Sequence, residues 1–486
     1  MKQTEISKAR GWWKHLLLLC VTLLGAIGIA TAQNYPFPQN YQYPYGTIYT
    51  ASGTTVKDRI QTLYEDWKRN YYVTSGNLGR VKFTQEGEDG SASVSEGIAY
   101  GMLIFVYMDN GTNNTQEDFD RLWRYYKKWE NNNGLMHWKV KEFGSTVIDP
   151  NGATDADLDA AQALLMAHKQ WGSNGSINYL NEAKTLINAI WNHEVNSARH
   201  LKPGDMFDDY KNPCYFITNA MQLFAYVESK EGWQTHSWSS VISNCYSLIK
   251  KTRNGSTGLV PDWCYQDGSY LTGLTNGKFE SIFGYDAVRV PWRMAHAYAW
   301  YGHQDAYDIA AKIVDWAQSK YPNPDDIVDG YRLNGTPGTG LGGSLSSWGT
   351  GKNACFKGGV SMASMIDSKY NSYMTKSWSV GSATDSWGKY YTHTTQLLFM
   401  LCMTGNMPNF WDMLPVPDAA ETNADGNAVY VDFSKAIASG VTASEWTVKT
   451  YADNDDATAT SITPNKVTVN GKRITLTLPS EISEPL

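Results

Sequence analysis

Hydrophobic and polar positions between residues 33 and 412 repeat at the spacing of α-helices. In one kind of segment the apolar residues fall at i, i+3, i+4 and i+7, which places a single apolar stripe on an otherwise polar helix. Segments of this kind predict half-exposed helices. Three examples of such stripes are Ile60, Leu63, Tyr64 and Trp67; Phe119, Leu122, Trp123 and Tyr126; and Ala183, Leu186, Ile187 and Ile190.

A second kind of segment is apolar on almost every side, as in Tyr100–Met108 and Leu158–Ala167. A helix without a polar face must be buried all round. The two kinds alternate, about eleven or twelve segments in all, joined by loops rich in Gly and Asn. Inner helices that alternate with outer ones predict an all-α fold, an (α/α)6 barrel. A helical solenoid is the alternative, although no repeat of fixed period is visible.

The pattern changes near Pro415. Residues 414–427 are mostly small and polar, which is typical of a linker. Beyond them, alternating polar and apolar residues predict strands at Ala428–Phe433, Glu445–Tyr451, Lys466–Asn470 and Arg473–Leu478. The last two flank Asn470-Gly471, a dipeptide favoured in hairpin turns. We expect residues 428–486 to form a partial, β-sandwich-like module.

The first 32 residues have the composition of a secretory signal peptide. A basic stretch precedes the apolar run Leu16–Ala30, which is short for a membrane span, and Ala30-Thr31-Ala32 has the form of a cleavage site. We therefore expect removal of residues 1–32 and a secreted or periplasmic protein with no stable membrane span, whose helical domain covers residues 33–413. A retained anchor is the alternative.

Composition narrows the functional classes. The chain has 486 residues, of which 42% are hydrophobic and 18% charged, enough to build a large core. It contains 19 Trp and 31 Tyr but only 14 Phe. Trp and Tyr join an apolar face to a polar edge, which suits a sugar that is stacked and hydrogen-bonded; large helical cores are their alternative use. A net charge of −7 argues against nucleic acid as a partner.

No motif indicates a metal or another cofactor. Five cysteines follow the signal segment without a CxxC pair, so neither a zinc knuckle nor a disulfide framework is indicated. Asp155, Asp157 and Asp159 resemble the start of a calcium loop, but Ala160 and Met166 stand where that loop needs Gly and Glu. We expect a monomer that works without a cofactor.

Three acidic residues stand at the starts of predicted inner helices: Glu96, Asp155 and Asp286. A single acidic residue there is usually a helix cap. Parallel inner helices, however, bring their N-termini together at one end of a barrel, where the helix dipoles favour carboxylates. Carboxylates that converge in an aromatic-lined cleft suit the cleavage of glycosides, in which one acid is protonated and the other is ionised.

Five motifs surround these acids or lie elsewhere in the helical region. They are Val94–Met102; Ala153–Asp157 with Ala161, Ala163, Ala167 and Trp171; Asn212–Phe216; Tyr285-Asp286-Ala287 with Arg289, Pro291, Trp292 and Arg293; and Thr404–Asn409. With these motifs the sequence resembles glycoside hydrolase family 8 over residues 35–412. Ala160 departs from the family pattern, which usually has Ile or Met there, and this concerns helix packing and not chemistry.

The resemblance implies an (α/α)6 barrel and an inverting mechanism. Glu96 would be the general acid, Asp286 the general base that activates water, and Asp155 the residue that holds the sugar at the cleavage subsite. Inversion requires enough room between acid and base for that water.

Four further residues are expected to bind the substrate. Arg289 and Tyr215 are implied by the resemblance. Trp138 and Tyr391 are candidates for stacking on sugar rings, with burial in the core as their alternative.

The expected function is endo-acting hydrolysis of β-1,4-glucan, either cellulose or mixed-linkage glucan. Asp286 in its motif indicates the cellulase and xylanase branch of the family and not the branch that includes chitosanases, and Ala153–Asp157 resembles the endo-acting members. Xylan hydrolysis, either endo-acting or releasing xylose from the reducing end, is the alternative. A carbohydrate-binding protein without turnover is a more distant one.

Overall fold

The computed structural model describes residues 34–51, 54–84, 88–271, 281–340, 348–385, 388–412, 417–433, 442–450, 460–470 and 473–482. The predicted signal segment lies outside these residues. The described residues form twelve α-helices, α2 to α13, with short strands in several of the connections and further strands after α13. Among these helices, none combines the length and apolar character needed to cross a membrane.

Six helices bury one face, as the apolar stripes predict. In α2, α4 and α6 the buried residues include every member of the three predicted stripes. Most polar residues of these helices lie toward solvent, with Asp120 and Glu194 as buried exceptions, so the three predicted stripes are confirmed. These outer helices are α2 (Thr55–Tyr71), α4 (Gln116–Lys128), α6 (Tyr179–Glu194), α8 (Trp238–Thr252), α10 (Gln304–Lys320) and α12 (Asn371–Gly381).

The other six helices are buried on most sides. Every residue of the first of them is buried except Glu96. Small residues permit this close packing: a Cβ atom on Gly101 would lie 2.7 Å from Leu122 Cδ1. These inner helices are α3 (Ser95–Met108), α5 (Thr154–Trp171), α7 (Thr218–Lys230), α9 (Val290–Tyr301), α11 (Ala354–Ser361) and α13 (Tyr390–Met403).

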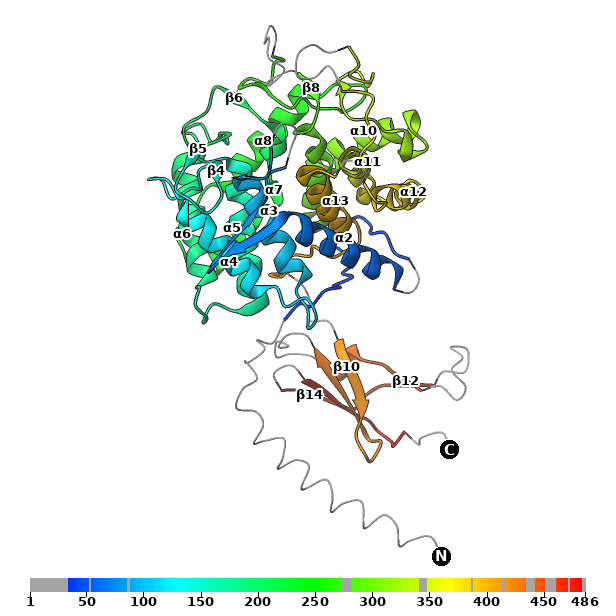
Figure 1. Cartoon of the computed structure of the whole chain (residues 1–486). Coiled ribbons are helices and arrows are strands. Elements are labelled where there is room, and N and C mark those ends of the chain that lie inside the picture. The colour runs from blue at the N-terminus through cyan, green and yellow to red at the C-terminus, as the bar shows by residue number, and fades with distance from the viewer. Residues whose placement is uncertain are drawn as a thin grey trace, which may run out of the picture. The chain divides into compact units, whose positions relative to one another are not determined.

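The inner helices form a closed ring. Each contacts the next in chain order, from α3 to α13, and α13 contacts α3. Each outer helix packs chiefly on one inner helix: α4 on α3, α6 on α5, α8 on α7, α10 on α9, α12 on α11 and α2 on α13. Figure 1 shows the two layers of helices. A solenoid has no closing contact, because its repeats touch only their neighbours. The arrangement is consistent with the predicted (α/α)6 barrel.

Short antiparallel strands lie in the connections before the inner helices. In one sheet β3 (Ala92–Val94) pairs with β4 (Lys139–Lys141), which pairs with β5 (Val147–Asp149). Because β3 runs directly into α3, this sheet fixes the start of that helix. The two-stranded pairs are β1 (Tyr72–Ser75) with β2 (Leu78–Val81), β6 (Tyr210–Lys211) with β7 (Cys264–Tyr265), and β8 (Ile282–Phe283) with β9 (Tyr331–Arg332).

The C-terminal residues form two antiparallel sheets. One has the order β10-β11-β15-β14, and the other pairs β12 (Val448–Thr450) with β13 (Thr460–Ile462). The hairpin prediction is confirmed, since Asn470 pairs with Arg473. The strands of the larger sheet are β10 (Pro417–Thr422), β11 (Ala428–Phe433), β14 (Lys466–Asn470) and β15 (Arg473–Thr477).

One expectation about this region is wrong. The segment 414–427, expected as a linker, contains strand β10. Small polar residues give no alternating pattern, and the strand forms because its backbone pairs with β11, from Pro417 opposite Phe433 to Thr422 opposite Val429. The cysteines of the described residues are all free and buried: Cys214, Cys245, Cys264, Cys355 and Cys402.

Candidate active site

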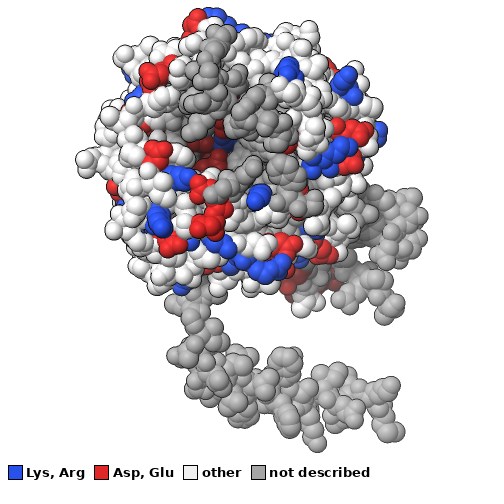
Figure 2. Space-filling model, turned by 45° about the horizontal axis from the view of Figure 1, so that its top comes forward, with Lys and Arg blue, Asp and Glu red and all other residues white. Residues whose placement is uncertain are grey.

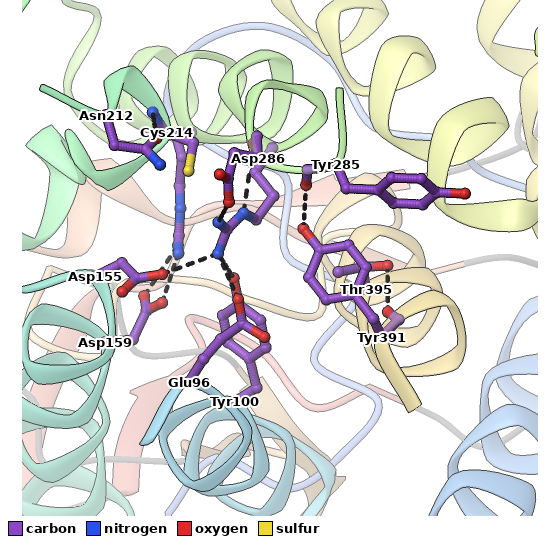
Figure 3. A network of polar contacts seen from close by, with 12 residues as sticks. Glu96, Tyr100, Asp155, Asp159, Asn212, Cys214, Tyr285, Asp286, Tyr391 and Thr395 are labelled. Atoms are coloured by element: carbon purple, nitrogen blue, oxygen red, sulfur yellow. Dashed lines mark hydrogen bonds and ion pairs between the residues drawn. The ribbon is translucent and has the colours of Figure 1, made fainter. Parts of the chain in front are cut away.

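One buried guanidinium connects the three predicted acids. Arg289 is 1% exposed. Its Nη1 donates to Glu96 Oε2 at 2.7 Å and to Asp155 Oδ2 at 2.9 Å, and its Nη2 donates to Asp286 Oδ1 at 2.7 Å. Figure 3 shows the three carboxylates pointing toward this common centre. The structure therefore brings together side chains that lie far apart in the sequence.

Each acid stands where an inner helix starts. Glu96 and Asp155 lie in the first turns of α3 and α5. Asp286 follows β8 and occupies the N-cap position of a short 3-10 helix, η3 (Ala287–Arg289), without a capping hydrogen bond to its side chain. This helix leads into α9, where Pro291 lies in the first turn. Helix N-termini carry partial positive charge, which favours carboxylates at these positions.

Glu96 is largely enclosed. Its side chain is 18% exposed, and its Oε1 accepts a hydrogen bond of 2.8 Å from the Tyr390 hydroxyl. The next residue, Gly97, makes room for this tyrosine, because a Cβ there would lie 2.9 Å from the Tyr390 oxygen. Burial raises the pKa of Glu96, and the Arg289 charge and the Tyr390 hydrogen bond only partly oppose this effect. The enclosure therefore keeps a proton on this carboxyl to a higher pH than an exposed glutamic acid would.

Asp155 is deeper still, with its side chain 3% exposed. Burial raises its pKa to about 7, the Arg289 charge lowers it, and the Glu96 charge raises it again. Glu96 and Asp155 share one guanidinium nitrogen, so the protonation of each depends on the other.

Asp286 is the most open of the three acids, with its side chain 32% exposed. Both of its oxygens accept hydrogen bonds: Oδ1 from Arg289, and Oδ2 from Trp263 Nε1 at 3.0 Å. These two donors fix the direction of the carboxylate while it remains accessible from the cleft.

The three acids line one cleft of about 640 Å³. Figure 2 shows acidic side chains inside a hollow of the surface that it draws. Aromatic faces beside carboxylates suit a ligand that is both apolar and hydroxylated. The aromatic residues of the lining are Phe83, Trp138, Tyr215, Tyr285, Trp348 and Tyr391.

All four predicted binding residues line this cleft. The Arg289 guanidinium lies 5.8 Å from the centre of the half-buried Tyr215 ring and 5.7 Å from that of Tyr391. Tyr391 is 7% exposed and its hydroxyl donates to the Tyr285 carbonyl at 2.5 Å, so it belongs to the core as well as to the lining. Trp138 is half-buried, and its carbonyl accepts the Ser95 N–H beside Glu96.

Several residues around the acids were not predicted. Tyr390 and Trp263 bind Glu96 and Asp286, and the Tyr100 hydroxyl accepts a 3.0 Å hydrogen bond from Arg289. Tyr100 could have been noticed, because it lies one helical turn after Glu96 on the same face. Trp263 belongs to a loop without periodic pattern. Within the described ranges, no cluster of three or more His, Cys, Asp or Glu residues could hold a metal ion.

Comparison with known proteins gives close sequence relatives. The family model for glycosyl hydrolases family 8 matches residues 36–405. Endoglucanase 2 of Ruminiclostridium josui is 34% identical over 419 residues, which cover 82% of this chain and 84% of that protein. Beta-glucanase of Niallia circulans is 32% identical over 419 residues, covering 81% and 96%.

Solved structures agree with these sequence matches. The apo structure of beta-1,3-1,4-glucanase from Paenibacillus sp. X4 has a TM-score of 0.68 and 31% identity, covering 77% of this chain and 99% of that one. Rex8A from Paenibacillus barcinonensis complexed with xylose has a TM-score of 0.61, covering 75% and 97%. At 20% identity, the second match shows the common fold alone.

Proposed function

Because the chain belongs to glycoside hydrolase family 8, whose members are inverting glycosidases, we propose that it is a secreted, endo-acting hydrolase of β-1,4-linked glucan. Cellulose and mixed-linkage glucan are the candidate substrates. Relatives named endoglucanase and beta-glucanase support this choice, at 32–34% identity over more than four fifths of the chain. The exo-oligoxylanase Rex8A is more distant, at 25% identity over 53% of the chain.

The observation that carries the mechanism is the different setting of two carboxylates on one guanidinium. Glu96 is enclosed and its pKa is raised by burial, which suits a general acid. Asp286 is open to the cleft and held by Arg289 and Trp263, which suits a general base that must reach water. A protonated acid beside an ionised base is what inverting hydrolysis requires.

The reaction takes one displacement. Asp286 accepts a proton from water as the water oxygen bonds to the anomeric carbon. Glu96 gives its proton to the glycosidic oxygen as the old C–O bond breaks, and the configuration at the anomeric carbon is inverted. Asp155 is placed to bind a hydroxyl of the sugar at the cleavage point, and Arg289 keeps all three acids in position.

The aromatic residues give the cleft its affinity for sugar rings. Trp138 and Tyr215 are half-buried and line the cleft, so each offers part of a ring face for stacking. Tyr391 contributes less area, because it is only 7% exposed.

We propose three parts for the chain. Residues 1–32 act as a signal peptide for secretion, and residues 33–413 form the catalytic domain. The C-terminal part is a small β-sandwich-like module that begins at β10. The apolar cluster of Val431, Ile474 and Leu476 in the larger sheet supports this assignment, because Val448 of the smaller sheet packs against it.

The decisive experiment treats carboxymethyl-cellulose, mixed-linkage glucan and xylan with the purified protein. We expect both glucans to give mixed oligosaccharides, with viscosity falling before many reducing ends appear. Nuclear magnetic resonance should detect the α-anomer first. Cleavage of xylan alone would overturn the substrate, release of xylose from reducing ends would overturn the endo mode, and an initial β-anomer would overturn inversion. Binding of glucan without any cleavage would favour the carbohydrate-binding alternative.

A further inference from the structure

A buried carboxylate lies beneath the turn that carries Asp286. Asp262 is 8% exposed, and one of its oxygens, Oδ1, accepts the N–H of Gly284 at 2.9 Å and the N–H of Ala287 at 2.7 Å. Its own N–H donates to the Ile282 carbonyl at 2.7 Å. Asp262 therefore holds the chain on both sides of Asp286.

The turn fits this carboxylate closely. A Cβ atom on Gly284 would lie 2.2 Å from Asp262 Oδ2 and 2.4 Å from Trp348 Cζ3. No side chain fits in that space, so the contact itself requires glycine at position 284. The approach leaves the turn little freedom to shift toward Asp262.

The next residue completes the hold on Asp286. Trp263 Nε1 donates to Asp286 Oδ2 at 3.0 Å, while Arg289 donates to Oδ1. Two consecutive residues thus fix the backbone and the side chain of Asp286. These are contacts that a general base needs, because proton abstraction depends on hydrogen-bond reach and direction.

We propose that Asp262 is a positioning residue for the general base: its carboxylate fixes the Gly284–Ala287 turn and thereby aims Asp286 at the attacking water. The inference rests on the proposed function, in which Asp286 is the base. Asp262 itself lies below the turn and takes no proton from the substrate. Its effect on the reaction passes through the position of Asp286.

Geometry and charge can be separated at this residue. The Asn side chain keeps an oxygen that accepts both N–H groups, whereas Ala removes it. Burial raises the pKa of Asp262 and so does the neighbouring Asp286 charge, while the two backbone hydrogen bonds lower it. If the role is geometric, Asp262→Asn retains function and Asp262→Ala does not.

The test is a double-mutant cycle with kinetics on mixed-linkage glucan. We expect Asp262→Ala to lower kcat about 10–100-fold, because small misplacement of a reacting group has effects of this size. The KM of Asp262→Ala should change less than about twofold, because substrate binding is retained. The kcat of Asp262→Asn should stay within about threefold of wild type, because the acceptor oxygen is retained.

The second half of the cycle uses Asp286→Ala with azide. Azide attacks the anomeric carbon without losing a proton, and Glu96 still protonates the leaving oxygen, so a glycosyl azide forms without a base. If Asp262 acts through Asp286, Asp262→Ala leaves this azide-dependent rate unchanged. Asp205→Ala is the matched control. Asp205 also accepts a backbone N–H, that of Gly152 at 2.8 Å, but near α5, so its effect should persist in the Asp286→Ala protein.

Three outcomes overturn the positioning role: full kcat in Asp262→Ala, equal losses in the Asn and Ala variants, or an undiminished Asp262→Ala effect without Asp286. Should Asp262→Ala not fold, as judged by circular dichroism, Asp262→Ser replaces it under the same criteria, because the shorter hydroxyl does not reach both N–H groups. Full activity of Asp286→Ala alone would instead overturn the proposed function.

Discussion

The two sides of the cleft that we propose to supply the acid and the base are built differently. Glu96 stands on the first turn of a regular, buried helix, and helix packing sets both its position and its burial. Asp286 stands in a turn between a strand and a 3-10 helix, where hydrogen bonds from other loops fix its position. The comparison teaches that one guanidinium can hold two carboxylates in different surroundings, one enclosed and one open to the cleft. This difference is what the proposed roles of acid and base require.

The largest expected effect comes from removing either carboxylate. Both Glu96→Ala and Asp286→Ala should lower kcat on glucan by on the order of 10³-fold, within the range typical of general acid–base groups. A dinitrophenyl cellotrioside separates them, since its leaving group departs without a proton. Glu96→Ala should recover most of its activity on this compound, and Asp286→Ala should not. The opposite pattern would exchange the two roles.

The next effect concerns the residue that the two sides share. Arg289→Met leaves three carboxylates without their common partner. We expect the free energy of unfolding, measured in urea, to fall by about 3–5 kcal/mol, as for other broken buried ion pairs. The activity on glucan should fall by roughly 100-fold or more. Arg289→Lys is the control: it keeps the charge but lacks the planar fork that reaches both sides. A Met variant as stable as wild type would contradict this account.

A smaller effect is confined to the acid side. In the wild type, the hydrogen bond from the Tyr390 hydroxyl to Glu96 Oε1 lowers the pKa of this carboxyl. Tyr390→Phe removes that hydrogen bond. The pKa should rise further in the variant, and because the acid must be protonated, the alkaline limb of the kcat/KM profile should move to higher pH. Loss of one hydrogen bond should lower kcat less than about tenfold.

Tyr391→Phe is the matched control for this measurement. Its hydroxyl donates to the Tyr285 carbonyl and not to Glu96. The control should leave the alkaline limb in place. An equal shift in both variants would mean that the limb does not report on Glu96.

The helical fold was largely predictable because its signal is local. The pattern of a single helix indicates which of its sides are buried, as the apolar stripe of α4 and the lack of a polar face in α3 illustrate. Strand β10 was not predictable, because small polar residues carry no alternation and the strand depends on pairing with β11. The contact between α13 and α3 also leaves no signal in the sequence pattern, which therefore does not distinguish a closed barrel from a solenoid. The structure shows this contact.

The site divides in the same way. The convergence of Glu96, Asp155 and Asp286 could be predicted because helix starts are marked in the sequence and because the motifs resemble a family. Their partners could not: Tyr390 lies 294 positions from Glu96, and only the closed ring brings the two together. The contact between Asp262 and the turn at Gly284 depends on the approach of two loops that lack periodic pattern.

The smallest effect concerns a buried pair of acids behind Asp155. Asp157 and Glu194 are fully buried. Asp157 Oδ2 and the two Glu194 oxygens make no well-formed hydrogen bond to other described residues, although the nearby Thr154 hydroxyl lowers the pKa of Glu194. A shared proton supplies a donor, and the two side chains then hydrogen-bond to each other. Burial raises the pKa of Asp157 to about 8 and raises that of Glu194 as well.

This pair should make stability depend on pH. In the unfolded chain both acids have a pKa of about 4, and folding raises both pKa values. The contribution to stability is therefore complete below about pH 4 and is lost as pH rises through about 8, by at most about 1.4 kcal/mol per pH unit for each proton. In Glu194→Gln the amide donates to Asp157 at every pH. Between pH 6 and 9 the Tm of wild type should fall about 2–4 °C further than that of the variant. Glu231→Gln, the same change at an exposed site, should follow wild type. If the Tm of all three proteins fell equally between pH 6 and 9, the pair would hold no proton in the folded state. Glu96 and Asp155 would then be the acids whose burial distinguishes the proposed acid side from the base side.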